Sequence, residues 1–505
     1  MTITDIHLPE SSRSGSEQRR RRRTTWMGPG GRLLAVALLA AAFGAAGAWL
    51  TPRGPITSGE ALATMGVALA VGGVAGYLGR TRWVFLIAPV AFVLAFELSR
   101  LSLVGPTVDA ISVGSLYGWM ALILGRGVHG LLAVAPILLG AFAGLWLVRR
   151  SDHGPSLSFG WTARILAALA TVGLVVLAVS IARPASTAEI LGGDGEGIAE
   201  IVTVSIGGHD QTMLIRGRNV DYPVLLYLAG GPGGTDLGAI RRDVSLEEDF
   251  VVVAWDQRGA GKSYASLDPV DTFTLDRLVA DTIEVTDYLR ERFSEDRIYL
   301  VGQSWGTTLG ALAVEQRPEL FHAFVGVGQM VSQRATDIMF WEDTLAWAEA
   351  SGETGLTATL GDNGPPPYEN INHYEPVVAY EHSWNSYPEL DLSNEMPSIL
   401  FVPEYSFMDR VNAFRGFFDT AAVLYPQLQG LDFRADIPAL GVPYYMVMGE
   451  HEARGRAVPA EDWFSALEAP HKEKLIFEGS GHRAHFDRPG EFAQMMERVL
   501  AETGG

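Results

Sequence analysis

A serine stands at the centre of the most distinctive chemical motif in the chain. The pattern Gly302-Gln303-Ser304-Trp305-Gly306 directly follows the apolar run Ile298–Val301 and precedes a helical pattern. Small residues two positions before and after the serine suit a strained turn in which neighbouring backbone passes close by. This strand–turn–helix context is that of the G-x-S-x-G nucleophile elbow, whose serine hydroxyl attacks an acyl carbonyl. We therefore expect Ser304 to be a catalytic nucleophile.

A serine nucleophile needs a base, which is usually a histidine. His482 lies in Gly479-Ser480-Gly481-His482, just after the apolar run Leu475–Phe477. A histidine in a loop after the last strand fits the chain order serine, acid, histidine. His485 is the alternative, and a solvated loop histidine is the non-catalytic interpretation. We predict that His482 is the base, because of its position after the strand.

The acid that orients the histidine should follow the apolar run Tyr444–Met448, in Gly449-Glu450-His451-Glu452. We predict Glu452 for this role, with Glu450 as the main alternative. A surface carboxylate without a catalytic role is the remaining interpretation. Glutamate can replace aspartate here, although its longer side chain requires a shifted backbone.

A glycine-rich turn, Gly230-Gly231-Pro232-Gly233, follows the apolar run Val224–Leu228. Glycines at this place let backbone N–H groups approach the substrate carbonyl. We expect the N–H groups of Gly231 and Trp305 to form the oxyanion hole. The alternative is a plain tight turn.

Short β-branched runs alternate with helical patterns from residue 201 onward. Apolar strands that alternate with helices predict a parallel sheet covered on both faces, with its site beyond the carboxyl ends of the strands. The region 333–436 interrupts this alternation and is rich in aromatic residues and prolines. We expect it to form a mainly helical cap over the site.

Four motifs together resemble the proline iminopeptidase branch of the α/β-hydrolases, which are serine peptidases that release amino-terminal residues. They are Ala229-Gly230-Gly231-Pro232-Gly233, Asp256-Gln257-Arg258-Gly259-Ala260-Gly261-Lys262-Ser263, Gly302-Gln303-Ser304-Trp305-Gly306 and Gly479-Ser480-Gly481-His482. With the cap, the resemblance covers roughly residues 200–500. It implies an α/β-hydrolase fold and the release of an amino-terminal residue, such as proline, from short peptides.

The sequence departs from this family at two positions. The family's glycine-proline motif usually begins with histidine, where this chain has Ala229, and its acid is usually aspartate, where this chain has Glu452. Family members bind the free amine of the substrate with cap carboxylates, and Glu342 is the candidate counterpart here. A solvated helix carboxylate is the alternative for Glu342. An esterase or amidase acting on substrates without a free amine, and a non-catalytic receptor on a hydrolase fold, are the alternative functions.

Charge divides the chain near Pro184. Residues 1–183 carry 16 basic and 7 acidic residues, and the remainder carries 22 and 51. An acidic second part repels phosphate, so we expect no nucleic-acid partner. The chain has no cysteine, and its histidines lack H-E-x-x-H spacing, so neither a metal site nor a cofactor is predicted. The expected partners are a small peptide or ester substrate and a lipid bilayer.

The first part of the chain is rich in long apolar stretches. A helix crosses the hydrocarbon core with about 20 mostly apolar residues. The stretches that qualify are Leu33–Leu50, Ala61–Leu78, Trp83–Leu103, Gly130–Val148 and Ile165–Ala182. Ile111–Leu124 is shorter and indicates an interfacial or re-entrant segment, with a sixth span as the alternative. A cleaved or twin-arginine export signal is the alternative for the first stretch.

Arginine placement predicts the orientation of these spans, because positively charged short loops stay in the cytoplasm. With five spans, one side holds Arg19–Arg23, Arg32, Arg80, Arg82, Arg149, Arg150 and Arg164. The other side holds only Arg53, Arg126 and Arg183, with Arg100 near the end of a span. We therefore expect a multi-pass protein of the cell membrane with a cytoplasmic amino terminus and an extracytoplasmic hydrolase domain.

The predicted organisation is an all-α transmembrane bundle followed by an α/β-hydrolase domain with a mainly helical cap. Its parts are a basic cytoplasmic tail (1–32), a membrane domain of about five helices (33–183), a linker (184–200), the first part of the hydrolase core (201–332), the cap (333–436) and the second part of the core (437–505).

Overall fold

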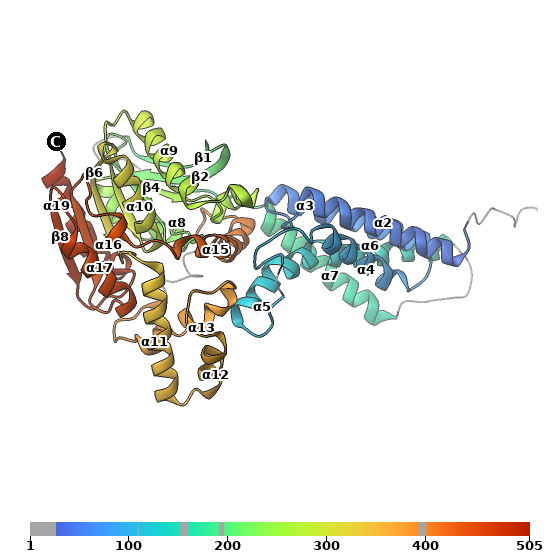
Figure 1. Ribbon diagram of the computed structural model, residues 1–505. Helices are drawn as coiled ribbons and strands as arrows, with labels where there is room; N and C mark the ends of the chain where they lie inside the picture. Colours follow the sequence, from blue (N-terminus) through green and yellow to red (C-terminus); the bar gives the residue numbers. More distant parts are fainter. Residues whose placement is uncertain (1–26, 110, 152–159, 191–195, 393–399, 505) are drawn as a thin grey trace, which may run out of the picture. The chain divides into compact units, whose positions relative to one another are not determined.

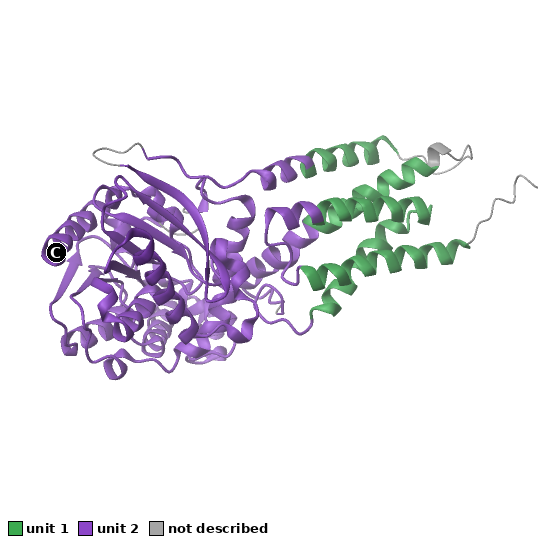
Figure 2. Cartoon of the chain, turned by 90° about the horizontal axis from the view of Figure 1, so that it is seen from above, with its two compact units in different colours: residues 1–50, 64–100, 132–174 green, residues 51–63, 101–131, 175–505 purple. Residues whose placement is uncertain are grey.

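The computed structural model describes residues 27–109, 111–151, 160–190, 196–392 and 400–504 (Figure 1). Most of the predicted basic tail, with Arg19–Arg23, and part of the predicted linker lie outside these residues. The chain divides into two compact units, drawn in different colours in Figure 2. One comprises residues 1–50, 64–100 and 132–174, and the other comprises residues 51–63, 101–131 and 175–505.

Apolar helices dominate the first third of the described chain. They are α2 (Pro29–Leu50), α3 (Ser58–Gly79), α4 (Val84–Ser99), α5 (Leu116–Leu122), the π-helical turn η1 (Ile123–Gly127), α6 (Val128–Ser151) and α7 (Trp161–Ala182). Among the residues that the structure describes, four stretches are long and apolar enough to cross a membrane: α2, α3, Leu116–Val148 and α7. Helix α4 is apolar but only 16 residues long, which is about 24 Å.

Small residues let two of these helices approach closely. A Cβ atom on Gly72 of α3 would lie 2.0 Å from the carbonyl oxygen of Ile137 in α6, and one on Gly140 of α6 would lie 2.1 Å from that of Leu69. Close backbone contacts at small residues are typical of helix pairs that pack in lipid. The pairing of α3 with α6 therefore depends on glycine at these positions.

An eight-stranded sheet forms the centre of the second unit, with the order β1-β2-β4-β3-β5-β6-β7-β8. Its strands are β1 (Ile198–Ile206), β2 (His209–Gly217), β3 (Val224–Leu228), β4 (Val251–Asp256), β5 (Ile298–Gln303), β6 (Phe321–Val327), β7 (Tyr444–Gly449) and β8 (Lys472–Phe477). The pairs β1–β2 and β2–β4 are antiparallel, and the strands from β4 to β8 pair in parallel.

Helices cover both faces of this sheet. Strands β3, β4, β5 and β7 are buried along their whole length, because their alternate side chains enter two separate cores. One core joins the sheet to α9 (Leu275–Phe293), α10 (Trp305–Gln316) and α17 (Arg454–Ala466). The other joins it to α8 (Leu237–Arg242) and α19 (Pro489–Thr503). The expected parallel sheet with helices on both faces is confirmed.

The segment between β6 and β7 is helical, as expected for the cap. Its elements are α11 (Gln333–Ser351), α12 (Thr354–Asn363), η6 (Ile371–His373), α13 (Glu375–Val378), α14 (Glu381–Trp384), α15 (Phe407–Leu428) and α16 (Phe433–Asp436). Aromatic residues of these helices form a hydrophobic cluster of their own around Phe340 and Tyr425. The remaining short elements are η2 (Ser245–Glu248), η3 (Gly261–Leu267), η4 (Val270–Thr272), η5 (Pro318–Leu320) and α18 (Ala484–Asp487).

Candidate active site

Ser304 occupies the turn between β5 and α10. Its backbone has φ 51° and ψ −118°, a strained conformation for a residue with a side chain. The turn is held by a 2.9 Å hydrogen bond from the Ser304 N–H to the carbonyl of Val327, in the neighbouring strand β6. The serine side chain is thereby lifted beyond the carboxyl end of the sheet, as the sequence motif predicts.

The two glycines of the motif are required by close backbone packing. A Cβ atom on Gly302 would lie 2.5 Å from the carbonyl oxygen of Gly306. A Cβ atom on Gly306 would lie 2.1 Å from the carbonyl oxygen of Leu228 in β3. Any larger residue at either position would push α10 away from the sheet and displace Ser304.

His482 and Glu452 come together from two different loops. Glu452 follows β7, His482 follows β8, and the Nδ1 atom of His482 lies 2.8 Å from Oε2 of Glu452. The carboxylate is almost fully buried, with 2% of its side chain exposed. Its other oxygen accepts hydrogen bonds from Nε of Arg456 at 2.7 Å and from the N–H of Ala453 at 3.0 Å.

These contacts keep Glu452 ionised despite its burial. Burial alone raises the pKa of the carboxyl group, but the charges of Arg456 and His482 and their hydrogen bonds outweigh it. The net result is a pKa of about 2. A carboxylate that stays charged can fix the imidazole with its Nδ1 proton inward and stabilise an imidazolium.

The two alternative residues have different surroundings. Glu450 is half exposed and accepts a 2.9 Å hydrogen bond from the N–H of Gly479. His485 is buried, its Nε2 atom lies 2.8 Å from the hydroxyl of Tyr227, and burial holds its pKa well below 6.5. The structure therefore brings together Glu452 and His482, the predicted acid and base, rather than either alternative.

The glycine-rich turn after β3 is tied to the nucleophile turn through Gln257. The indole Nε1 of Trp305 donates to Oε1 of Gln257 at 2.9 Å, and Nε2 of Gln257 donates to the carbonyl of Ala229 at 3.1 Å. Gly231 lines the same cavity as Ser304. Trp305 is the first residue of α10, so its backbone N–H is one of those that a helix leaves unpaired in its first turn.

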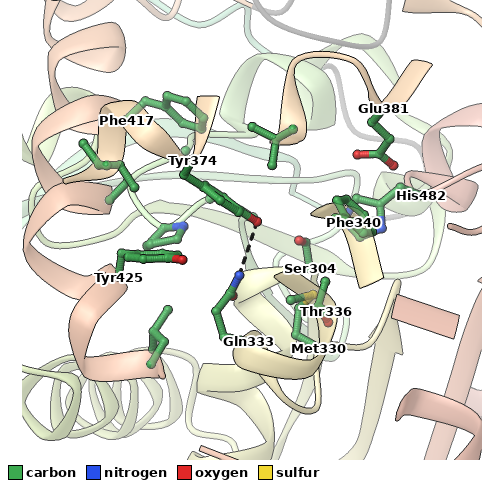
Figure 3. Close-up of a pocket in the computed structure, with 18 of the residues that line it drawn as sticks. Ser304, Met330, Gln333, Thr336, Phe340, Tyr374, Glu381, Phe417, Tyr425 and His482 are labelled. Atoms are coloured by element: carbon green, nitrogen blue, oxygen red, sulfur yellow. Dashed lines mark hydrogen bonds between the residues drawn. The ribbon is translucent and has the colours of Figure 1, made fainter. Parts of the chain in front are cut away.

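A cavity of about 350 Å³ contains Ser304 and His482 (Figure 3). Its walls come from the core, the glycine-rich turn and the cap, and they are largely apolar and aromatic. The cap contributes Phe340, Tyr374, Phe417 and Tyr425. The size suits a small substrate and excludes a folded one.

Comparison with known proteins assigns this architecture to a family. The family described as alpha/beta hydrolase fold matches residues 223–369. A Bacillus subtilis protein named probable aminopeptidase YbaC is 30% identical over 305 residues, which are 60% of this chain and 96% of the relative. The chain belongs to the α/β-hydrolase superfamily, in its proline iminopeptidase-like branch. It is a hydrolase with a helical region added before the shared domain.

Other relatives of this hydrolase match over shorter stretches or at lower identity. A probable proline iminopeptidase of Leptolyngbya boryana is 29% identical over 123 residues, which are 24% of this chain and 36% of the relative. A solved structure of a proline iminopeptidase-related protein from Thermus thermophilus is 22% identical and covers 61% of this chain and 98% of its own, with a TM-score of 0.41.

The cap carboxylate of the hydrolase cavity differs from the one predicted. Glu342 is not among the described residues that line the cavity, and its carboxylate, 52% exposed, pairs with Arg454 at 3.0 Å. The cavity is lined instead by Glu381 of α14, which hydrogen-bonds Arg456. Arg456 therefore bridges Glu381 and Glu452, and it is buried over the ring of Phe340.

Several residues of the hydrolase site were not predicted from the sequence. Glu381 and Arg456 belong to no local motif, because only the folding of the cap brings them to the cavity. Tyr117 also lines the cavity, although it precedes Ser304 by almost two hundred positions and lies in the segment predicted to be interfacial or re-entrant. A tyrosine between two apolar stretches carries no signal of its own in the sequence.

Proposed function

We propose that this hydrolase is a membrane-anchored serine hydrolase of proline iminopeptidase type, which releases an amino-terminal residue from short peptides. Ser304 is the nucleophile, His482 the general base, and Glu452 the acid that orients the base. The N–H groups of Gly231 and Trp305 form the oxyanion hole. The observation that carries the proposal is the 2.8 Å contact between His482 and a buried, ionised Glu452, beside the cavity that also contains Ser304.

The reaction follows from these roles. Ser304 Oγ attacks the acyl carbon while Nε2 of His482 takes the hydroxyl proton, and the two N–H groups stabilise the oxyanion. The tetrahedral intermediate breaks its carbon–nitrogen bond, and the leaving amine takes the proton from His482. Water, deprotonated by His482, then attacks the acyl-enzyme and releases the free amino acid and the serine hydroxyl.

Turnover of proline-naphthylamide by the purified full-length protein tests the proposal. We expect Ser304→Ala to reduce kcat by about 10⁶, because the nucleophile is lost. Glu450→Gln is the matched control, since this exposed carboxylate lies outside the cavity, and it should retain activity. Unchanged turnover in Ser304→Ala would contradict the proposal.

A second candidate is an esterase or amidase whose substrates lack a free amine. It is favoured by the contact between Glu381, the carboxylate that lines the cavity, and Arg456. A carboxylate already paired with a guanidinium attracts a substrate ammonium less than an unpaired one. Comparing prolyl-naphthylamide with its N-acetylated form separates the two, because an aminopeptidase should lose activity on acetylation and an esterase or amidase should not.

We propose that the protein crosses the cell membrane several times and that its hydrolase domain lies outside the cytoplasm. Arg53, between the first two apolar helices, bonds Asp268 at 2.9 Å, and Thr107, after α4, bonds Asp419. Residues 51–57 and 101–108 therefore lie on the same side of the proposed membrane as the hydrolase core. Leu124 also contacts this core, through Arg415, so both ends of the predicted re-entrant segment lie on that side. These contacts support five crossings rather than six.

A further inference from the structure

One wall of the active-site cavity comes from the segment between two predicted membrane spans. Tyr117, the second residue of α5, lines the same cavity as Ser304 and His482. Its ring packs edge-on against Phe418 of the cap, with the centroids 5.3 Å apart and the planes at 76°. Aromatic pairs of this geometry stabilise each other beyond the area they bury.

The position of Tyr117 is fixed by a buried carboxylate. The side chain of Glu375, 8% exposed, accepts hydrogen bonds from the N–H groups of Leu116 at 2.9 Å and of Tyr117 at 3.0 Å. The hydroxyl of Ser115 accepts a third from Gly118. These bonds satisfy N–H groups that the first turn of a helix leaves without a partner. Helix α5 is thereby attached to α13 of the cap.

Buried polar residues join helix α15, which carries Phe418, to the same inter-span segment and to the segment before α3. Arg415 donates to the carbonyl of Leu124 at 3.0 and 3.1 Å and to that of Pro55 at 2.8 Å. Asp419 accepts from the N–H and hydroxyl of Thr107. Both side chains are fully buried, so they hold this wall as a fixed part of the site.

Helix α5 is not needed to cross the membrane, so it can form part of the cavity wall. The apolar stretch Leu116–Val148 has 33 residues and is about 50 Å long, whereas the hydrocarbon core is about 30 Å thick. The π-helical turn Ile123–Gly127 divides it, and Arg126 in that turn bonds the carbonyl of Val108 at 2.8 Å. The part after this turn is long enough to cross the membrane alone.

We propose that Tyr117 is a specificity-determining residue, and that with Phe418 it forms the surface against which an apolar group of the substrate packs. The inter-span segment is then part of the enzyme as well as part of its anchor. This inference rests on the proposed serine hydrolase function. It predicts that Tyr117 discriminates among substrates without taking part in the attack by Ser304.

The test compares Tyr117→Ala with Trp119→Ala in the full-length protein. Trp119 lies on the same short helix, is 49% exposed, and is not among the described residues that line the cavity. We expect Tyr117→Ala to lower kcat/KM for bulky apolar amino-acid naphthylamides about tenfold more than for the alanine derivative. Trp119→Ala should leave this ratio unchanged, and Tyr117→Phe should preserve it because the ring is retained.

Labelling of Ser304 by a small fluorophosphonate is measured on the same samples. Equal labelling of the unmodified protein and Tyr117→Ala, together with the altered substrate ratio, supports the inference. An unaltered ratio with normal labelling overturns the inference and leaves the serine mechanism standing. Loss of labelling in Tyr117→Ala alone also overturns it, because the effect would then be structural. Absence of labelling in the unmodified protein overturns the serine mechanism and the inference with it.

Discussion

The side chain of Glu452 combines burial with contacts to Arg456 and His482. Arg456 holds one carboxylate oxygen at 2.7 Å and His482 contacts the other at 2.8 Å. Because the pKa in the folded protein lies at about 2, below its ordinary value of 4.5, these contacts stabilise the fold above pH 4.5. This stabilisation is lost as the pH falls from 4.5 towards 2. Across the neutral range the carboxylate is available to orient His482.

Replacing Glu452 by glutamine tests this role. We expect Glu452→Gln to lower kcat by about 10⁴, because a neutral amide does not stabilise the imidazolium formed during attack. The measurement is steady-state turnover of the same naphthylamide near neutral pH. Glu450→Gln should stay close to the unmodified rate, and the opposite ranking of the two variants would assign the acid to Glu450.

Asp337 is a buried carboxyl group that contacts Gln333, a residue of the cavity wall. Burial raises its pKa to about 6, although hydrogen bonds from Tyr374, Gln429 and Gln333 lower it in part. Gln333, which lines the cavity, donates to Asp337 at 2.6 Å. Between pH 3.8 and about 6, the folded protein retains a proton that the unfolded chain has lost. Folding stability therefore falls as the pH rises through this window.

The variant Asp337→Asn should lose this pH dependence. The stability lost between pH 4 and pH 7 should shrink by roughly 2 kcal/mol, because the pKa is about 6 in place of 3.8 and the unfolded aspartate is already largely ionised at pH 4. Thermal denaturation of the detergent-solubilised protein at several pH values provides the measurement. Asp256, whose pKa burial also raises to about 6, should leave a residual slope in the variant. Equal slopes in the variant and the unmodified protein would contradict the assignment.

Helices and strands can be predicted from the sequence where a local residue pattern marks them. Around Ser304, an apolar run, two glycines and a helical pattern follow one another in the sequence. Strand β5 and helix α10 lie where this pattern predicts them. Strand β2 was missed because its residues include polar ones such as Gln211 and Arg216, which are nevertheless buried. The two-residue turn Gly207-Gly208, with φ of 58° and 77°, was the available hairpin signal.

The cap carboxylate that faces the cavity could not be predicted from the sequence, for a different reason. Glu342 and Glu381 are both cap carboxylates, and nothing in their local sequence distinguishes the one that faces the cavity. Only the packing of α14 and α17 against α11 brings Glu381 to Arg456. Ser304, His482 and Glu452 were predictable because each directly follows a strand of the sheet.

Arg415 of α15 joins this helix to the segments that contain Pro55 and Leu124, and its replacement tests how much these contacts stabilise the protein. We expect Arg415→Leu to destabilise the protein, because the hydrogen bonds from its charged guanidinium to the carbonyls of Leu124 and Pro55 would be lost, at about 1.5–3 kcal/mol each. The midpoint of thermal denaturation should fall accordingly. Arg334→Leu on the exposed surface of α11 is the matched control. Similar midpoints for both variants would show that these buried hydrogen bonds contribute little.

At the scale of the whole molecule, the hydrolase core includes segments from the first third of the chain. The compact unit that contains the sheet also contains residues 51–63 and 101–131 (Figure 2). These residues supply Arg53, whose guanidinium pairs with Asp268 and Asp419, and Tyr117 in the cavity. In the proposed topology, several spans rather than one deliver both segments to the hydrolase, so the apolar helices would contribute to the site as well as to the anchor.

Labelling of intact cells with a membrane-impermeant fluorophosphonate tests both the Ser304 nucleophile and the side of the membrane on which it lies. The reagent reacts only with an activated serine, and only on the outer side of the membrane. We predict labelling before lysis in cells with the unmodified protein, and none in cells with Ser304→Ala. Labelling that requires lysis would contradict the proposed sidedness. Equal labelling of the Ser304→Ala protein, or none of the unmodified protein even after lysis, would contradict the serine mechanism.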